Sequence, residues 1–109
     1  MSYWYGEPDR DFYTMRATAQ MLSNLGGLYN KASENKENSA CIAIQNRIHL
    51  ECACAMFFEL DCYPIYNIYT GLIRVMRVHN LKTDEVIDIY PTPPKHPETL
   101  DKFRTGAVS

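Results

Sequence analysis

The sequence predicts a mainly α protein, folded as a compact three-helix bundle. Apolar residues recur every three or four positions over residues 9–32, which is the spacing of one helix face. The stretch 40–62 holds all four cysteines, has neither Gly nor Pro, and is apolar enough for a helix surrounded by others. The 109 residues suffice for one core. We expect one domain over residues 1–90 and an extended Pro-rich tail over 91–109.

The first helix is expected over residues 9–32. Asp9 follows a proline and is a suitable N-cap residue. Gly26 and Gly27 interrupt the apolar stripe, and each costs a helix about 1 kcal/mol relative to Ala. They either end the helix or let another backbone approach closely. Because the stripe continues to Tyr29, we favour a helix that continues with a tolerated kink.

The second element is predicted as a buried helix over residues 39–60, after a polar surface loop, SENKEN, at 33–38. Alternate positions from 42 to 62 are apolar apart from Asn46, as in a strand. A strand of some twenty residues would extend about 66 Å, against a radius of gyration of about 13 Å expected for this size. A strand over 42–50 that passes into a helix is the alternative.

A third helix is predicted over residues 64–80, because Pro is accepted in a first helical turn and apolar residues recur there with helical spacing. A short terminal helix, ending at Ile89, completes the bundle. The alternative is an α+β fold with a hairpin near residues 72–90, in which LIRVMRVH pairs with VIDIY across NLKTDE. The β-branched content of both segments favours this pairing.

Charge and cysteine usage exclude several classes of function. Eleven Lys and Arg against thirteen Asp and Glu give a net charge of -2, so we do not expect nucleic acid as a partner. The N-terminus lacks the features of a secretory signal, and no apolar run approaches the roughly 18 residues of a membrane span. We therefore expect a cytoplasmic protein without membrane association. The four cysteines lie among apolar residues and are expected to be reduced core thiols.

No set of residues has the spacing of a catalytic site. The cysteines lie in an apolar run, whereas a nucleophile needs a base beside it in a polar setting. We expect a non-enzymatic protein without a cofactor. His49 and Cys52 could share one helix face and bind a metal, but the paired knuckles of structural zinc sites are missing, so core packing is the favoured interpretation.

A candidate ligand site lies on the predicted third helix. Arg74 and Arg77 are three residues apart and therefore neighbours on a helix. Tyr66, Asn67 and Tyr69 lie within two turns of them. Arg and Tyr together can hold a nucleotide or another phosphorylated ligand by a charge-assisted hydrogen bond and a stack. A solvated face with ordinary salt bridges is the competing interpretation.

The aromatic content indicates a contact surface. Eight tyrosines, one tryptophan and four phenylalanines exceed what a minimal core needs, and Tyr and Trp are enriched at protein interfaces. Tyr3, Trp4 and Tyr5 form one candidate patch. We therefore predict a small interaction protein, of the regulator or inhibitor type, that binds a protein partner through aromatic and helical faces and forms a homo-oligomer. Binding of an anionic small ligand by the arginine site is the alternative.

Overall fold

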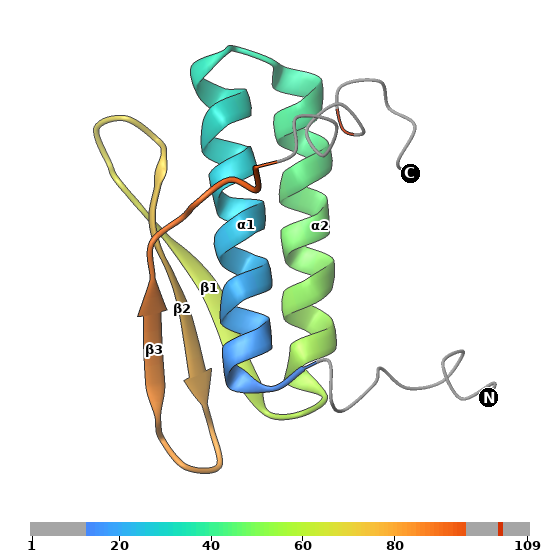
Figure 1. Cartoon of the computed structure of the whole chain (residues 1–109), viewed down its shortest axis with the longest axis vertical. Coiled ribbons are helices and arrows are strands. Elements are labelled where there is room, and N and C mark those ends of the chain that lie inside the picture. The colour runs from blue at the N-terminus through green and yellow to red at the C-terminus, as the bar shows by residue number, and fades with distance from the viewer. Residues whose placement is uncertain (1–12, 96–102, 104–109) are drawn as a thin grey trace, which may run out of the picture.

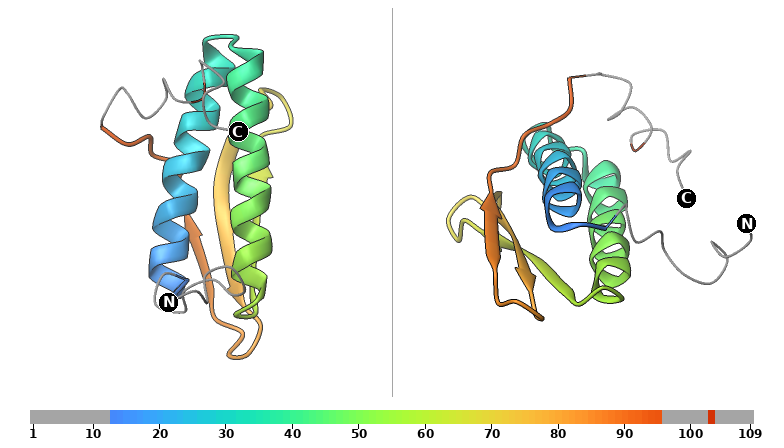
Figure 2. Two further views of the ribbon diagram at one scale, coloured as in Figure 1. Left: turned by 90° about the vertical axis from the view of Figure 1, so that its right-hand side faces the viewer. Right: turned by 60° about the horizontal axis from the view of Figure 1, so that its bottom comes forward.

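The computed structural model describes residues 13–95 and residue 103. Two helices come first, α1 (Met15–Glu34) and α2 (Asn38–Met56). Three strands follow, β1 (Leu60–Tyr66), β2 (Ile73–Asn80) and β3 (Val86–Ile89), and they form one antiparallel sheet in the order β1-β2-β3. Both helices lie on the same side of this sheet (Figure 1, Figure 2). The fold is therefore a two-layer α+β arrangement, and no described element covers the opposite face, called the open face below.

The predicted three-helix bundle is wrong, and the α+β alternative is the fold observed. Residues 64–80, expected as the third helix, form most of β1, a loop and β2, and the expected terminal helix is replaced by β3. The helical spacing has a specific origin in the β1–β2 pairing. Ile65 of β1 pairs with Val75 and the next residue of β1 pairs with Ile73, so Arg74 of β2 has no partner and forms a bulge. Because of this extra residue, Ile73 and Met76 both lie in the core although they are three positions apart. A bulged strand thus imitates the period of a helix.

The two helices were predicted correctly in kind. α1 begins at Met15, where the Thr14 side chain accepts a hydrogen bond from the Ala17 N–H at 3.1 Å. The expected cap Asp9 lies outside the described residues. α2 ends at Met56, earlier than predicted, and a strand over 42–50 is not formed. Its buried positions recur every three or four residues, at Ala40, Ile44, Ile48, Glu51 and Ala55.

The core lies between the helical layer and the sheet. Leu22 of α1, Ile44 of α2, and Met76 and Val78 of β2 are all fully buried. Burial of each such side chain stabilises the fold by about 1.5–3 kcal/mol. β2 is the central strand and packs against α1, whereas α2 packs against β1.

After β3 the chain crosses the outside of α1 (Figure 1). The Thr92 N–H donates to the Ser23 carbonyl oxygen at 3.0 Å, and the Ser23 hydroxyl donates to the Tyr90 carbonyl oxygen at 2.6 Å. A Cβ added to Gly27 would lie only 2.7 Å from the Cα of Pro93. α1 continues past both glycines, and Gly27 is required because another backbone approaches it.

Candidate functional site

The loop between β1 and β2, residues 67–72, is held by its own hydrogen bonds. The Asn67 side chain accepts a hydrogen bond from the Tyr69 N–H at 2.8 Å. The Asn67 N–H donates to the Leu72 carbonyl oxygen, and the Gly71 N–H donates to the Asn67 carbonyl oxygen, both at 2.8 Å. Gly71 has φ 76°, a left-handed conformation that glycine adopts without strain. The loop therefore keeps a defined shape without burying its apolar side chains.

Two large apolar side chains project from this loop into solvent. Ile68 is 85% exposed and Tyr69 is 91% exposed, more than any other large apolar side chain among the described residues. Tyr69 was singled out from the sequence as a ligand-binding residue, but Ile68 was not. The signal available for Ile68 was its position between an Asn and a Gly, which are typical of a turn.

The open face of the sheet carries a row of side chains, one from each strand. Arg77 of β2 binds Asp88 of β3 through two hydrogen bonds, Nε to Oδ1 at 2.7 Å and Nη2 to Oδ2 at 2.8 Å. Tyr63 of β1 lies opposite Arg77 in the register. The Arg77 guanidinium lowers the pKa of Asp88, and the Asp88 carboxylate raises the pKa of Arg77. Within this row, Arg77 and Asp88 form a cross-strand ion pair on an exposed surface, and their charges neutralise each other.

The structure distributes the predicted ligand-binding residues over four places. Arg77 lies in the row on the open face and is engaged by Asp88. Arg74 is exposed at the irregularity of β2. Tyr66 packs edge-on against Tyr29 of α1, with ring centroids 6.3 Å apart, while Asn67 and Tyr69 belong to the loop. Ligand binding by these residues stays a prediction, and the helix that was to bring them together is not formed.

The predicted contact patch, Tyr3, Trp4 and Tyr5, lies outside the described residues. The suggested metal pair lies on α2, where His49 is exposed and Cys52 is half-buried. Within residues 13–95 and 103, no three His, Cys, Asp or Glu side chains are placed to hold a metal ion.

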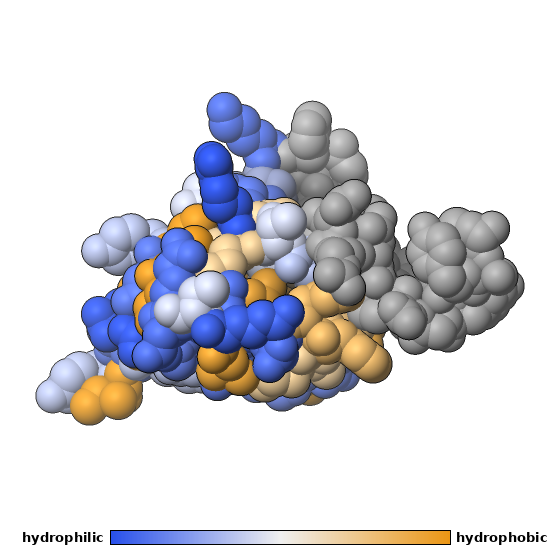
Figure 3. All heavy atoms as spheres, turned by 90° about the horizontal axis from the view of Figure 1, so that it is seen from below, coloured by the Kyte–Doolittle hydropathy of each residue, from blue (hydrophilic) through white to orange (hydrophobic). Residues whose placement is uncertain are grey.

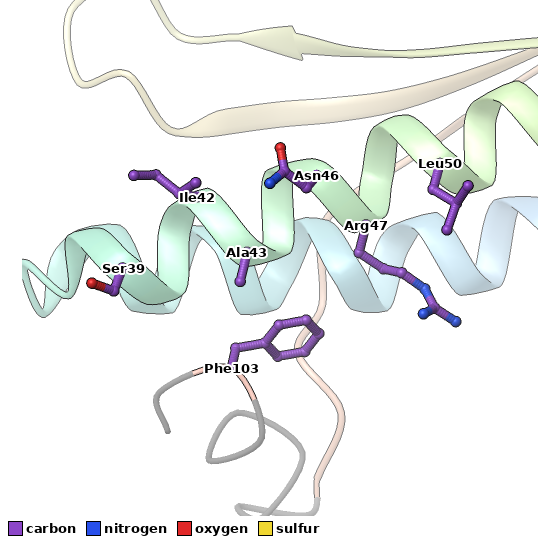
Figure 4. A pocket seen from close by; sticks show the side chains of 7 residues that line it. All are labelled: Ser39, Ile42, Ala43, Asn46, Arg47, Leu50 and Phe103. Atoms are coloured by element: carbon purple, nitrogen blue, oxygen red, sulfur yellow. The ribbon is translucent and has the colours of Figure 1, made fainter. Parts of the chain in front are cut away.

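A cavity of about 400 Å³ lies on the outer side of α2 (Figure 4). Phe103, which is 7% exposed, lines one side of it, and in Figure 4 its ring lies beside Ala43 and Arg47. The remaining lining residues are Ser39, Ile42, Asn46 and Leu50. Of these, Ile42 and Leu50 are exposed apolar side chains. The lining residues hold no acid, thiol or histidine, so this cavity has no acid–base or nucleophilic group of its own.

One buried carboxylate, Glu51 of α2, lies next to the residues that line this cavity. Glu51 is 6% exposed and accepts hydrogen bonds from the Tyr13 hydroxyl at 2.6 Å and from Arg47 Nε at 2.9 Å. Burial and the neighbouring Glu51 raise the pKa of Tyr13. Both carboxylate oxygens thus have partners, as a structural group requires. This cluster joins the start of α1 to α2.

Apolar side chains reach the surface in separate patches among polar ones, as the end view of the molecule shows (Figure 3). Neither α1 nor α2 is long and apolar enough to cross a membrane. In comparisons with known proteins, no family model, no curated protein and no solved structure matches the chain. The cytoplasmic location stays a prediction from the sequence.

Proposed function

We propose that this chain is a small non-enzymatic module that binds protein through the β1–β2 loop and the open face of the sheet, and that a second copy of the chain is one such partner. The observation that supports the proposal is the pair Ile68 and Tyr69, exposed on a loop closed by hydrogen bonds. Tyr is enriched among residues that dominate binding energy, and a preformed loop loses little entropy on binding.

The free energy gained by burying Ile68 and Tyr69 is large enough for specific association. Full burial of a large apolar side chain is worth about 1.5–3 kcal/mol, so the pair together contributes about 3–6 kcal/mol. Each 1.4 kcal/mol is a factor of about ten in Kd. Loss of this pair is therefore expected to weaken association by at least about a hundredfold.

The open face suits contact with an identical face. Its central ion pair, Arg77 with Asp88, is neutralised within one molecule, so two copies meet without strong like-charge repulsion. Pairing through the free edge of β1 is disfavoured, because Pro64 has no N–H to donate to another strand. We therefore assign self-association to side chains on the face and loop.

Sedimentation equilibrium of the full chain over a wide concentration range tests the proposal. We expect a concentration-dependent dimer that is lost in the double variant Ile68→Ser with Tyr69→Ser. The matched control is Phe57→Ser, which removes a 69% exposed aromatic side chain beyond the end of α2 and is expected to leave the dimer unchanged. A strict monomer at all concentrations contradicts self-association, and equal loss in the control contradicts the assignment to the loop.

A further inference from the structure

β3 is an edge strand, and on the side away from β2 no strand of the described chain lies beside it (Figure 1). In antiparallel strands, pairs of residues that exchange hydrogen bonds alternate with pairs that do not. The Asn80 N–H donates to the Glu85 carbonyl oxygen at 2.8 Å, one step beyond the pair of His79 with Val86. Val86 and, two residues later, Asp88 therefore direct their N–H and C=O groups away from β2.

The β1–β2 pairing leads to the same assignment. The Leu81 N–H donates to the Glu59 carbonyl oxygen at 2.8 Å, so the odd-numbered residues near this end of β2 bond to β1. The even-numbered residues of β2 thus bond to β3, where their partners have odd numbers. The outward N–H and C=O groups of Val86 and Asp88 consequently have no hydrogen-bond partner among the described residues.

The free edge of β3 lacks the proline, the bulge and the unpaired charge that protect many edge strands. β1 carries Pro64 at its own free edge, whereas β3 has no proline and pairs with β2 in an unbroken register. The one charged side chain of β3, Asp88, is neutralised by Arg77. β3 thus presents four unpaired backbone groups at a two-residue spacing, which an added extended strand matches.

We propose that this edge accepts a further β-strand, and that β3 of a second copy fills it in an antiparallel pairing centred on Ile87. In this register Val86 of each copy lies opposite Asp88 of the other, so all four outward groups of each copy gain a partner. Ile87 packs against the core on the helical side of the sheet, and it would lie directly opposite Ile87 of the other copy. Such apolar cross-strand pairs stabilise a sheet.

The neighbouring registers are less favourable. A pairing centred on Asp88 would place two carboxylates directly opposite each other, which is destabilising. It would also use the Tyr90 carbonyl oxygen, which already accepts a hydrogen bond from the Ser23 hydroxyl. A pairing centred on Val86 would place Asp88 opposite Asp84, whose φ of 67° is not that of a strand. The backbone and the charges therefore favour the register centred on Ile87.

This contact is separate from the proposed contact through the β1–β2 loop and the open face, and it does not rest on that proposal. It consists of four backbone hydrogen bonds and one apolar pair, each of modest net strength, so we expect it at about millimolar concentration. The test uses the double variant Ile68→Ser with Tyr69→Ser, in which the loop contact is removed. Failure of the edge contact is then distinguished from failure of the loop contact.

A synthetic peptide that copies residues 85–90, EVIDIY, serves as the added strand in an NMR titration of this full-length variant. The Val86 and Asp88 amide signals should shift and exchange more slowly with solvent, whereas the Ile87 and Ile89 amides, already bonded to β2, should change little. N-methylation of the peptide residue that copies Asp88 should weaken binding at least about tenfold. The matched control is N-methylation of the residue that copies Ile87, whose N–H points away from the edge, and it should leave binding unchanged.

The same amides report pairing between two copies. Without peptide, exchange at Val86 and Asp88 should slow by at least about twofold as the variant is concentrated to the millimolar range. Exchange that does not depend on protein concentration overturns the assignment to a second copy. Equal binding of the two methylated peptides, or signal shifts confined to residues outside β3, overturns the edge site itself.

Discussion

Gly26 and Gly27 are adjacent in α1, and together they permit a matched test of whether Gly27 is required for the close approach of the segment at Thr92 and Pro93. Gly26→Ala and Gly27→Ala each replace a helical glycine, so each gains about 1 kcal/mol of helix propensity. Their surroundings differ. A Cβ at Gly26 would lie 3.4 Å from Met76 Cγ, an ordinary contact with a flexible side chain, whereas at Gly27 it would overlap the backbone at Pro93.

The cost at Gly27 follows from the hydrogen bonds that depend on the close approach. Displacement of the crossing segment breaks the Thr92 N–H bond to the Ser23 carbonyl oxygen and the Ser23 hydroxyl bond to the Tyr90 carbonyl oxygen. Each hydrogen bond is worth about 0.5–1.5 kcal/mol, and a buried hydroxyl left without a partner costs about 1–3 kcal/mol. After the gain in helix propensity, we expect Gly27→Ala to destabilise the protein by about 1–3 kcal/mol.

Urea denaturation and hydrogen exchange together measure this effect. Gly26→Ala should match or exceed the wild-type free energy of unfolding and keep the Thr92 amide protected from exchange. Gly27→Ala should be less stable and lose that protection. If the two variants have equal stability and equal Thr92 protection, close backbone approach is not the reason for Gly27.

Three further substitutions have expected outcomes. The Thr18 hydroxyl is buried and has no hydrogen-bond partner among the described residues, so Thr18→Val should leave stability unchanged or raise it by about 1 kcal/mol in thermal unfolding; a clear loss would reveal a partner. Tyr13→Phe removes the donor to buried Glu51 and should cost about 1–3 kcal/mol in urea denaturation, whereas an unchanged midpoint would mean that the carboxylate finds another donor. Because Arg77 lowers the pKa of Asp88, the stability from this pair is present above the unfolded-state pKa of Asp88 and is lost as pH falls through the lower folded value. Carbon NMR titration should show that pKa rising in Arg77→Gln, and no rise would contradict the pairing.

The site was predictable only in part. Tyr69, Asn67, Arg74 and Arg77 were identified from their residue types, but they were grouped on a helix that does not exist. Tyr63 was not singled out, because its link to Arg77 depends on the pairing register of two strands. Pairing registers join residues far apart in sequence, and periodicity within one segment carries no information about them.

The positions of the cysteines illustrate the same limit. The sequence showed that Cys52 and Cys54 cannot share a helix face, which holds for the observed α2. It did not show that β1, which holds Cys62, packs against α2, because the pattern of residues 39–60 predicts one continuous helix. The turn at Glu59, with φ 60°, reverses the chain and brings β1 back along α2.

The sequence by itself determined the helical layer. Three local features predict it: the helical spacing of apolar residues in α1, the excessive length that a strand over the residues of α2 would have, and the polar segment between the two helices. Each feature lies within one segment, so it can be recognised without the rest of the fold. Only the tertiary structure decided the sheet, the exposure of the β1–β2 loop and the purpose of Gly27. These depend on which distant segments lie side by side, and the pattern within one segment carries no information about its neighbours in space.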